Sequence, residues 1–242
     1  MNIAVIFAGG VGVRMHTTSR PKQFLELAGK PIIVYTLELF DVHPEVDAIV
    51  VACLESWIPF LEKMIRKFEI NKVVRIVPGA GSGQGSIYNA LCASEEYARE
   101  KGNENPVVLI HDGVRPLIKE ETITDCIHTT REKGNCITCV LATETFIVKQ
   151  KDGVFEIPTR DNSLIARAPQ CFMLKDIIAA HRKSQQRGLP DFIDSCSLMN
   201  YFGATIHTII GPMENIKITT PTDFFLFRAI VQVRENQQIF GI

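Results

Sequence analysis

The sequence lacks any apolar run long enough to cross a bilayer, because no window approaches the roughly 18 consecutive apolar residues of a membrane span. It also lacks the marks of a secretory leader: the opening MNIAVIFAGG has no basic stretch before its short apolar run and no small-residue cleavage site. Of the 242 residues, 46% are hydrophobic and 22% are charged, which is the composition of a folded domain with a sizeable core. We therefore expect a cytoplasmic protein without a membrane partner, folded as one domain over residues 1–242.

An excess of charge of one sign is lacking as well. The chain has 26 Lys and Arg against 27 Asp and Glu, for a net charge of -1. Such a balance gives no excess of positive charge that would attract DNA, RNA or anionic lipid. We expect no nucleic-acid partner, so any site for an anion must be built from a few local residues.

The cysteines do not form a framework. There are seven, an odd number scattered mostly within apolar runs, so a disulfide scaffold is not expected. Cys136 and Cys139 form a C-x-x-C, but the alternating run around them places residues three apart on opposite faces of a strand. Because no second pair completes a zinc site, we interpret all seven as reduced core thiols.

Short β-branched runs alternate with longer segments of helical period, a pattern typical of parallel strands joined by helical crossovers. Strands are predicted at Ile3–Phe7, Ala48–Cys53, Val73–Val77, Val107–His111, Ile137–Ala142 and Thr205–Ile210. Helices are predicted at Pro31–Phe40, Ser56–Phe68, Ser86–Glu100, Glu120–Lys133, Leu174–Gln186, Ser195–Tyr201 and Pro221–Arg234. The predicted fold class is α/β, a Rossmann-like three-layer domain with a mixed, mainly parallel central sheet.

The regular alternation breaks after Ala142. Residues 147–157 read as two short strands around Lys151, Asp152 and Gly153, a turn-forming sequence typical of a hairpin. We expect this β-hairpin to protrude as an arm over about residues 144–165. An arm on a compact body often serves a partner subunit, so we predict a homodimer that forms through it.

A glycine-rich turn follows the first predicted strand, at the place where open α/β sheets bind ligands. Its glycines let backbone N–H groups approach phosphate oxygens, and the alternative is a plain tight turn. Arg14 and Lys22 place two cations around the same loop, and fixed cations stabilise the pyrophosphate that leaves a triphosphate. The predicted nucleotide-binding residues of this turn are Ala8, Gly9, Gly10 and Gly12.

Two familiar phosphate-binding motifs do not match this turn. No Gly-Lys-Ser/Thr follows at Walker spacing. The dinucleotide pattern G-x-G-x-x-G also fails, because Met15 stands where its last glycine should be, and Glu55 lies about 40 rather than about 20 residues further on. These mismatches weigh against a P-loop enzyme and against a dinucleotide-dependent oxidoreductase.

Four motifs in order carry a resemblance to a known family. They are A-G-G-x-G-x-R-M followed by P-K-Q-F, then H-D-x-x-R-P, then A-P-Q-x-F, and finally N-I-K-I-T-x-P-x-D. In order and spacing, over almost the whole chain, they are similar to the methylerythritol phosphate and ribitol phosphate cytidylyltransferases. The resemblance implies a nucleotide-diphospho-sugar transferase type of fold. It also implies that the CMP part of CTP is joined to a small polyol phosphate, with release of pyrophosphate.

The second motif stands at the end of the fourth predicted parallel strand. A carboxylate there can hold Mg²⁺ against phosphates, and the alternative is an ion pair between Asp112 and Arg115 that braces the turn. In the resembling family this motif lines the nucleotide and acceptor sites. We therefore predict Asp112 as a metal ligand, Asp112 and Arg115 as acceptor contacts, and Mg²⁺ as the cofactor.

A second glycine-rich loop, residues 78–86, follows the third predicted strand and precedes a helix. Backbone amides and a helix N-terminus there favour an anion or a polar base edge. Ala80, Gly81 and Ser86 are the residues predicted to contact the nucleotide. The family usually has an arginine two or three residues before this serine, whereas this chain has only glycine and glutamine there.

The last motif supplies a further cation. A lysine flanked by apolar residues on a strand edge is either snorkelling or aimed into a site, and the resemblance implies that Lys217 contacts the α-phosphate. The predicted catalytic set is Arg14, Lys22 and Lys217, which would carry the charge that develops in the reaction.

The resemblance also implies an acceptor pocket. Thr145 and Arg160, on either side of the arm, would bind the acceptor phosphate, with a second subunit delivering the arm, and Asp194 would hydrogen-bond acceptor hydroxyls. Ala168 and Ile193 replace hydroxyl residues typical of the methylerythritol phosphate enzymes, which favours D-ribitol 5-phosphate. The alternatives are 2-C-methyl-D-erythritol 4-phosphate of isoprenoid synthesis and another alditol phosphate of a surface polysaccharide. The missing arginine also leaves open a non-catalytic nucleotide-binding protein.

Overall fold

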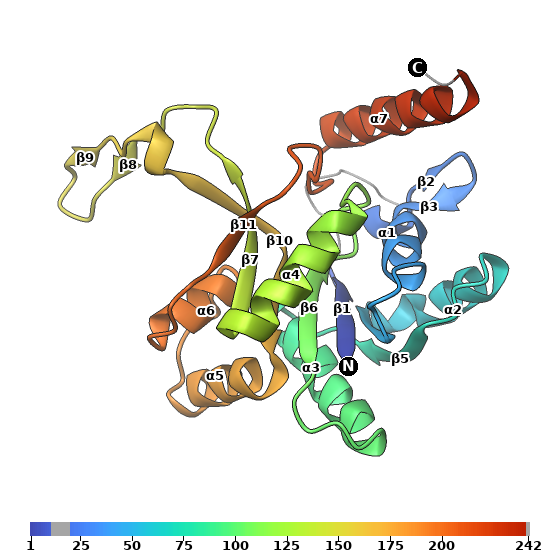
Figure 1. Ribbon diagram of the computed structural model, residues 1–242, viewed down its shortest axis with the longest axis horizontal. Coiled ribbons are helices and arrows are strands. Elements are labelled where there is room, and N and C mark those ends of the chain that lie inside the picture. The colour runs from blue at the N-terminus through green and yellow to red at the C-terminus, as the bar shows by residue number, and fades with distance from the viewer. Residues whose placement is uncertain (11–19, 241–242) are drawn as a thin grey trace.

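The computed structural model describes the backbone of residues 1–10 and 20–240, and the side chains of these ranges as far as Asn236 (Figure 1). Its centre is a seven-stranded sheet with the strand order β11-β7-β10-β6-β1-β4-β5. Every neighbouring pair in this sheet is parallel except the two pairs that β10 makes with β6 and β7. The predicted α/β class with a mixed, mainly parallel sheet is confirmed.

The strands of this sheet are β1 (Asn2–Ala8), β4 (Ala48–Cys53), β5 (Val73–Pro78), β6 (Val107–Asp112), β7 (Asn135–Leu141), β10 (Leu164–Met173) and β11 (Thr208–Ile210). Two separate hairpins join β2 (Glu26–Leu27) to β3 (Lys30–Pro31) and β8 (Val148–Lys149) to β9 (Phe155–Glu156). The α-helices are α1 (Ile32–Asp41), α2 (Ile58–Lys67), α3 (Gly83–Glu100), α4 (Glu120–Lys133), α5 (Leu174–Gln186), α6 (Ser195–Tyr201) and α7 (Pro221–Phe240). Short 3-10 helices are η2 (Lys22–Phe24), η3 (Glu55–Trp57) and η4 (Arg160–Asn162). None of the helices described is long and apolar enough to span a membrane.

The central strands are apolar along their length because helices cover both faces of the sheet. Every residue of β4 and β6 is buried. One face packs against α1, α2 and α4, and the other against α3, α5 and α6, which gives three layers (Figure 1). Since β1, β4, β5 and β6 are parallel, their carboxyl ends meet at one edge, where both glycine-rich loops lie.

The cysteines behave as core residues. Cys136 and Cys139 belong to core clusters on opposite faces of β7, as the alternation predicts. All seven cysteines are free thiols. The C-x-x-C therefore brings no pair of thiols to a common site.

The strand β10, which is the antiparallel strand of the sheet, is not among the strands predicted from the sequence. Its sequence contains Arg167 and Pro169, and a proline has no N–H to donate to a ladder, so the run argues against a strand. The structure accommodates the proline at an irregularity, because the register with β7 shifts between Ala166 and Gln170. The A-P-Q-x-F motif thus lies at a break in the β7 ladder.

Four other predicted elements differ in detail. The third predicted helix begins at Gly83 instead of Ser86, because the hydroxyl oxygen of Ser82 caps it by accepting a 3.0 Å hydrogen bond from the Gly85 N–H. The segment of Lys217 is irregular and forms no strand. The strand predicted at residues 205–210 shortens to β11, and α7 continues beyond the predicted end at residue 234.

The strands β8 and β9 form the predicted hairpin arm, which projects away from the sheet (Figure 1). Gly153 in its turn has a φ of 87°, a conformation that favours glycine. The arm carries large apolar side chains in the open: Ile147, Phe155 and Ile157 are 65%, 63% and 64% exposed. An exposed apolar surface of this kind marks an interaction site.

Two buried histidines make the stability of the fold depend on pH. Burial lowers the pKa of both His111 and His181 to about 4, below the ordinary value of about 6.5. Between these values the unfolded chain binds more protons than the folded chain, so the free energy of unfolding falls as the pH is lowered from about 6.5 toward 4.

We predict that His181→Gln reduces this pH dependence, because the substitution removes one of the two groups. In urea unfolding between about pH 7 and pH 5, the slope of the unfolding free energy against pH should fall by up to about 1.4 kcal/mol per pH unit. The same substitution at His128, whose side chain is 61% exposed, serves as the control. A slope for His181→Gln equal to that of the wild type would contradict the assignment.

Candidate functional site

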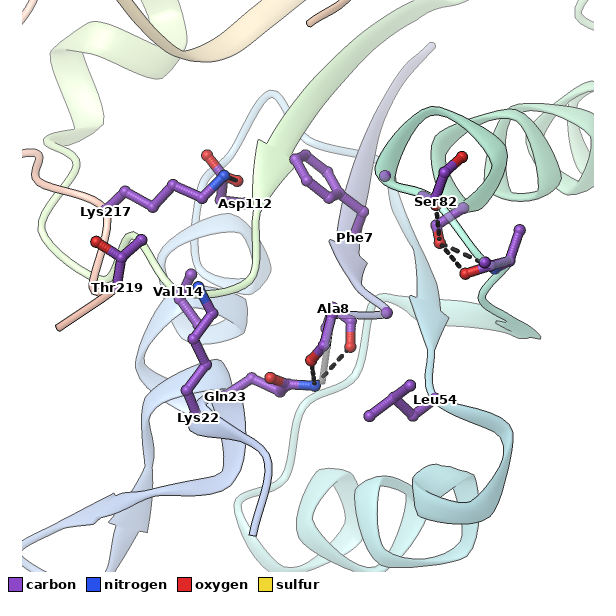
Figure 2. A pocket seen from close by; sticks show the side chains of 16 residues that line it. Phe7, Ala8, Lys22, Gln23, Leu54, Ser82, Asp112, Val114, Lys217 and Thr219 are labelled. Carbon is purple, nitrogen blue, oxygen red and sulfur yellow. Dashed lines mark hydrogen bonds and ion pairs between the residues drawn. The ribbon is translucent and has the colours of Figure 1, made fainter. Parts of the chain in front are cut away.

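A first cavity, of about 560 Å³, opens at the carboxyl ends of β1 and β6, beside the start of α3 (Figure 2). Its walls come from segments far apart in the sequence: the turn after β1, η2, the loop before α3, the turn after β6, and the irregular segment before α7. This is the edge of the sheet where open α/β folds bind ligands.

The side chain of Gln23 holds the turn after β1 through two hydrogen bonds. This side chain is buried, and its Nε2 donates hydrogen bonds to the carbonyl oxygens of Ala8 at 2.7 Å and Gly10 at 3.2 Å (Figure 2). The P-K-Q-F motif therefore does two things, because Gln23 fixes the turn while Lys22 lines the cavity beside it.

The two glycine-rich loops touch each other. A Cβ added at Gly9 would lie 2.7 Å from Ser86 Oγ, and one added at Gly79 would lie 3.1 Å from Gly9 Cα. Ser86 in turn holds its own loop, since its Oγ accepts from the Ala80 N–H at 2.9 Å and donates to the Ser82 carbonyl at 2.9 Å. Glycine is required where the backbones meet so closely.

Asp112 is the charged centre of the site. It is only 5% exposed, and its Oδ2 lies 2.7 Å from Arg115 Nε while its Oδ1 lies 2.5 Å from Lys217 Nζ. Burial raises the pKa of Asp112, but the charges of Arg115 and Lys217 outweigh burial and hold the pKa well below its ordinary value. The carboxylate therefore stays ionised at neutral pH.

A backbone carbonyl joins this ion pair to β10. The carbonyl oxygen of Asn215 accepts from Arg115 Nη1 at 2.9 Å and from Arg167 Nη1 at 2.8 Å. The buried Asn215 side chain donates through Nδ2 to the Ala168 carbonyl at 2.6 Å. Burial and the neighbouring Arg115 lower the pKa of Arg167. Two guanidinium groups thus lie side by side, next to a carboxylate.

A second cavity, of about 360 Å³, adjoins the first and shares four lining residues with it, namely Phe7, Gly83, Asp112 and Lys217. Arg115 and Arg167 add cationic side chains to its wall, and Asp194 adds a carboxylate. Both cavities therefore meet at the Asp112 and Lys217 pair. The arrangement can hold two phosphorylated molecules with their phosphates close together.

Most of the predicted site residues come together here. The first cavity is lined by Ala8, Gly9, Gly10, Lys22, Ala80, Gly81, Ser86, Asp112 and Lys217. Asp112, Arg115, Asp194 and Lys217 line the second. The ion pair between Asp112 and Arg115, considered above as an alternative, is present in the same site. Gly12 and Arg14 lie outside the described residues.

Thr145 and Arg160 line neither cavity. Both lie on exposed positions of the segment that carries the arm, between β7 and β10. Within one chain the structure does not bring these two residues to the site, so their predicted role depends on a second chain.

Sequence analysis overlooks Arg167, Gln23 and Gln84. An arginine in an unrecognised strand gives no signal, because Arg167 becomes relevant only when β10 places it against Asn215. Gln23 was visible in its motif, but its bonds to the turn after β1 depend on the tertiary fold. Gln84 lines the second cavity from the first turn of α3.

Comparison with known proteins finds the same organisation elsewhere. The model of the family described as 2-C-methyl-D-erythritol 4-phosphate cytidylyltransferase matches residues 2–233. The chain is 49% identical over 242 residues to a protein of Vibrio parahaemolyticus, and 46% identical over 243 residues to one of Streptococcus agalactiae. Both of these are named ribitol-5-phosphate cytidylyltransferase, and each alignment covers 100% of both chains.

Among solved structures, the chain is similar to 4-diphosphocytidyl-2C-methyl-D-erythritol synthase from Anaerococcus prevotii. The TM-score is 0.81 and the sequence identity is 26%, over 96% of each chain. The fold is therefore that of this group of nucleotidyltransferases.

The contact between the two glycine-rich loops generates a prediction about stability. Gly9→Ala places a methyl group against Ser86 Oγ and should lower the free energy of unfolding by roughly 1–3 kcal/mol. In the double variant Gly9→Ala with Ser86→Ala that oxygen is absent, so the total loss should be smaller than the sum of the single losses by at least about 0.5 kcal/mol. Urea unfolding of the four proteins measures this coupling. Strictly additive losses would show that the two loops do not meet.

Proposed function

Because the chain belongs to the 2-C-methyl-D-erythritol 4-phosphate cytidylyltransferase family, we propose that it condenses CTP with D-ribitol 5-phosphate to give CDP-ribitol and pyrophosphate. The observation that carries this proposal is the pair of adjoining cavities that share Asp112 and Lys217. The names of the relatives at 49% and 46% identity support ribitol 5-phosphate as the acceptor. CTP is a cytoplasmic metabolite, which supports a cytoplasmic location, and CDP-ribitol would serve a cell wall or capsule polysaccharide.

The first cavity suits the nucleotide. The turn after β1 and the N-terminus of α3 both line it, and a helix N-terminus and the backbone N–H groups of a glycine-rich turn favour phosphate oxygens. The contact between Gly9 and Ser86 brings the two loops together at its wall, where close backbone approach can select a base edge. CTP would then lie with its α-phosphate toward Asp112 and Lys217.

The second cavity suits the acceptor. Its phosphate would lie near Lys217, Arg115 and Arg167, with one oxygen in line with the α-phosphorus of CTP. That oxygen attacks, the bond from the α-phosphorus to the bridging oxygen breaks, and pyrophosphate leaves. A phosphate monoester is already a nucleophile near neutral pH, so the reaction needs no general base, and positioning and charge neutralisation supply most of the rate.

Lys217 is the cation best placed to carry developing charge. Asp112 holds its ammonium group (Figure 2), and both residues line the two cavities. Lys22 lines the first cavity from η2, and Arg14, which lies outside the described residues, completes the proposed catalytic set. These positive charges would stabilise the transition state as negative charge moves to the leaving group.

Mg²⁺ is the proposed cofactor, held by Asp112 and by oxygens of CTP. This ion prefers oxygen ligands and usually takes one or two carboxylates together with substrate phosphates. Within the described part of the chain, Asp112 is the only acidic residue that lines the first cavity, and no cluster of three metal-ligating side chains occurs there. Both oxygens of this carboxylate already pair with cations, Lys217 and Arg115, so most ligands of the ion would come from CTP and water. The ion would neutralise charge on the triphosphate.

The wall of the second cavity supports ribitol 5-phosphate over 2-C-methyl-D-erythritol 4-phosphate. Ala168 and Ile193, which replace hydroxyl residues of the methylerythritol phosphate enzymes, both line this cavity. The replacements therefore lie where the acceptor would bind. The second candidate acceptor remains 2-C-methyl-D-erythritol 4-phosphate, because the matching family carries that name.

We also propose a homodimer that forms through the arm. The exposed side chains of Ile147, Phe155 and Ile157 supply an apolar surface on the hairpin, and burial of apolar surface drives association. The partner's arm would bring Thr145 and Arg160 toward the acceptor, because neither residue lines a cavity of its own chain.

The proposed reaction is tested by pyrophosphate release from CTP and Mg²⁺, with ribitol 5-phosphate and 2-C-methyl-D-erythritol 4-phosphate assayed in parallel. We expect turnover with ribitol 5-phosphate and a much lower kcat/KM with the other acceptor. A preference for 2-C-methyl-D-erythritol 4-phosphate would reassign the acceptor. If neither acceptor gives pyrophosphate release although the protein binds CTP, a non-catalytic role would be indicated.

Lys22→Ala should lower turnover far more than it weakens CTP binding, because the charge acts mainly on the leaving pyrophosphate. We predict a loss of about 10²–10³ in kcat and a change below about tenfold in the Kd of CTP from calorimetry. Lys30→Ala is the control, since Lys30 pairs with Glu38 at 2.7 Å and lines neither cavity. Equal losses in kcat and in CTP affinity would refute the catalytic role.

Charge on the arm should separate the subunits. Phe155→Lys combined with Ile157→Lys is expected to give a monomer in light scattering at micromolar concentration, because a dimer would have to bury both ammonium groups. Val42→Lys, at a position 76% exposed and far along the chain from the arm, should leave the dimer intact. A wild-type protein that is monomeric at micromolar concentration would exclude the proposed dimer.

A further inference from the structure

Two residues that line the second cavity each have a buried oxygen atom without a hydrogen-bond partner among the described residues. These atoms are the hydroxyl Oγ of Ser195 and the amide Oε1 of Gln84. Ser195 is 1% exposed and Gln84 is 8% exposed. Buried polar atoms in native proteins are almost always hydrogen-bonded, and an unpaired one costs about 1–3 kcal/mol. Because both residues line one cavity, a ligand there can pair with these atoms once the two side chains turn toward it.

Two polar side chains beside them, Asp194 and Gln170, are already engaged. Asp194 caps α6 by accepting from the Ser197 N–H at 2.8 Å, and it also accepts from Gln170 Nε2 at 3.1 Å. Gln170 Oε1 accepts from the Cys196 N–H at 2.9 Å. These bonds fix the start of α6, where Ser195 is the first residue. The hydrogen-bonding capacity left open in this wall therefore includes Ser195 and Gln84.

The chemistry of these two atoms limits the group that they can bind. An amide oxygen only accepts hydrogen bonds, and a serine hydroxyl donates or accepts. A phosphate or carboxylate oxygen would face Gln84 Oε1 with no hydrogen to share. A hydroxyl group can donate to Gln84 and can pair with Ser195 in either direction, so a chain of hydroxyls suits this wall.

The cavity is also divided by charge. Its cations, Arg115, Arg167 and Lys217, belong to the network around Asp112 and Asn215. Gln84 and Ser195 lie on α3 and α6, the helices that cover one face of the sheet. An acceptor with its phosphate on the cations would extend its carbon chain toward these helices.

We propose that Ser195 and Gln84 bind hydroxyl groups of the polyol chain and so make the enzyme select a long, polyhydroxylated acceptor. The proposal rests on the proposed function and adds to it the residues that read the carbon chain. A site that hydrogen-bonds a substrate hydroxyl discriminates strongly against an analogue without it, because the buried protein groups are then left unpaired.

A bound water is the rival occupant for Gln84 alone. A small cavity of about 70 Å³ lies on the other side of this residue, and His181, whose Nε2 also lacks a partner among the described residues, lines it too. A water there could join the two side chains. Ser195 does not line that small cavity, so the proposal depends first on Ser195.

The test compares a long acceptor with a short one. The KM and kcat for ribitol 5-phosphate, and the inhibition constant of glycerol 3-phosphate against it, are measured for the wild type, Ser195→Ala and Gln84→Met. The inhibition constant reports affinity whether or not the short compound is turned over. We expect each variant to lower kcat/KM for ribitol 5-phosphate by about tenfold, mainly through KM. The inhibition constant of glycerol 3-phosphate and the Kd of CTP should stay within about twofold.

Ser197→Ala is the matched control, because it makes the same change two residues along α6 and lines neither cavity. Thermal melts identify any variant whose activity falls because the protein is less stable. If Ser195→Ala leaves KM for ribitol 5-phosphate unchanged, or weakens both compounds equally, the proposal is wrong while the proposed function stands. If Ser195→Ala raises KM for ribitol 5-phosphate and Gln84→Met does not, Gln84 pairs with water and its part of the proposal is wrong. If the wild type releases no pyrophosphate from CTP, the proposed function is wrong, and this inference is wrong with it.

Discussion

The buried carboxylate of Asp112 is the interaction on which the site depends. A charge at this depth is stable only when paired, and removing one partner of a buried pair typically costs about 3–5 kcal/mol. Asp112 has two partners, Arg115 at 2.7 Å and Lys217 at 2.5 Å. Through the carbonyl of Asn215, the same network reaches Arg167 on β10. One buried charge thus ties the end of β6 to β10 and to the segment before α7, and it lies where the two cavities meet.

The glycine-rich loops impose a second constraint. Gly9 and Ser86 meet so closely that a side chain at Gly9 would strike the serine hydroxyl. The resembling family usually has an arginine just before this serine, where this chain has glycine and glutamine. Gln84 lines the second cavity and not the first. Gly83, three residues before the serine, lines both cavities, so the departure from the family pattern alters the walls proposed for the nucleotide and for the acceptor.

Much of the fold could be predicted from local sequence because the parallel strands are buried on both faces. β4 is apolar at every position, and its predicted bounds agree with the structure. β10 could not be predicted, since Arg167 and Pro169 contradict a strand and only its pairing with β6 and β7 explains them. In the site, Asp112 and the glycines were visible as motifs. The function of Arg167 depends on a carbonyl 48 positions away, which no local pattern contains.

In the proposed function, the two cavities hold the two halves of one product, which meet at Asp112 and Lys217. A crystal structure with bound CDP-ribitol would show whether they do. We expect cytidine in the cavity between Gly9 and Ser86, the diphosphate at Lys217, and the ribitol chain in the cavity lined by Asp194 and Ser195. A ribitol chain outside that second cavity, or a cytidine within it, would show that the two cavities do not have these roles.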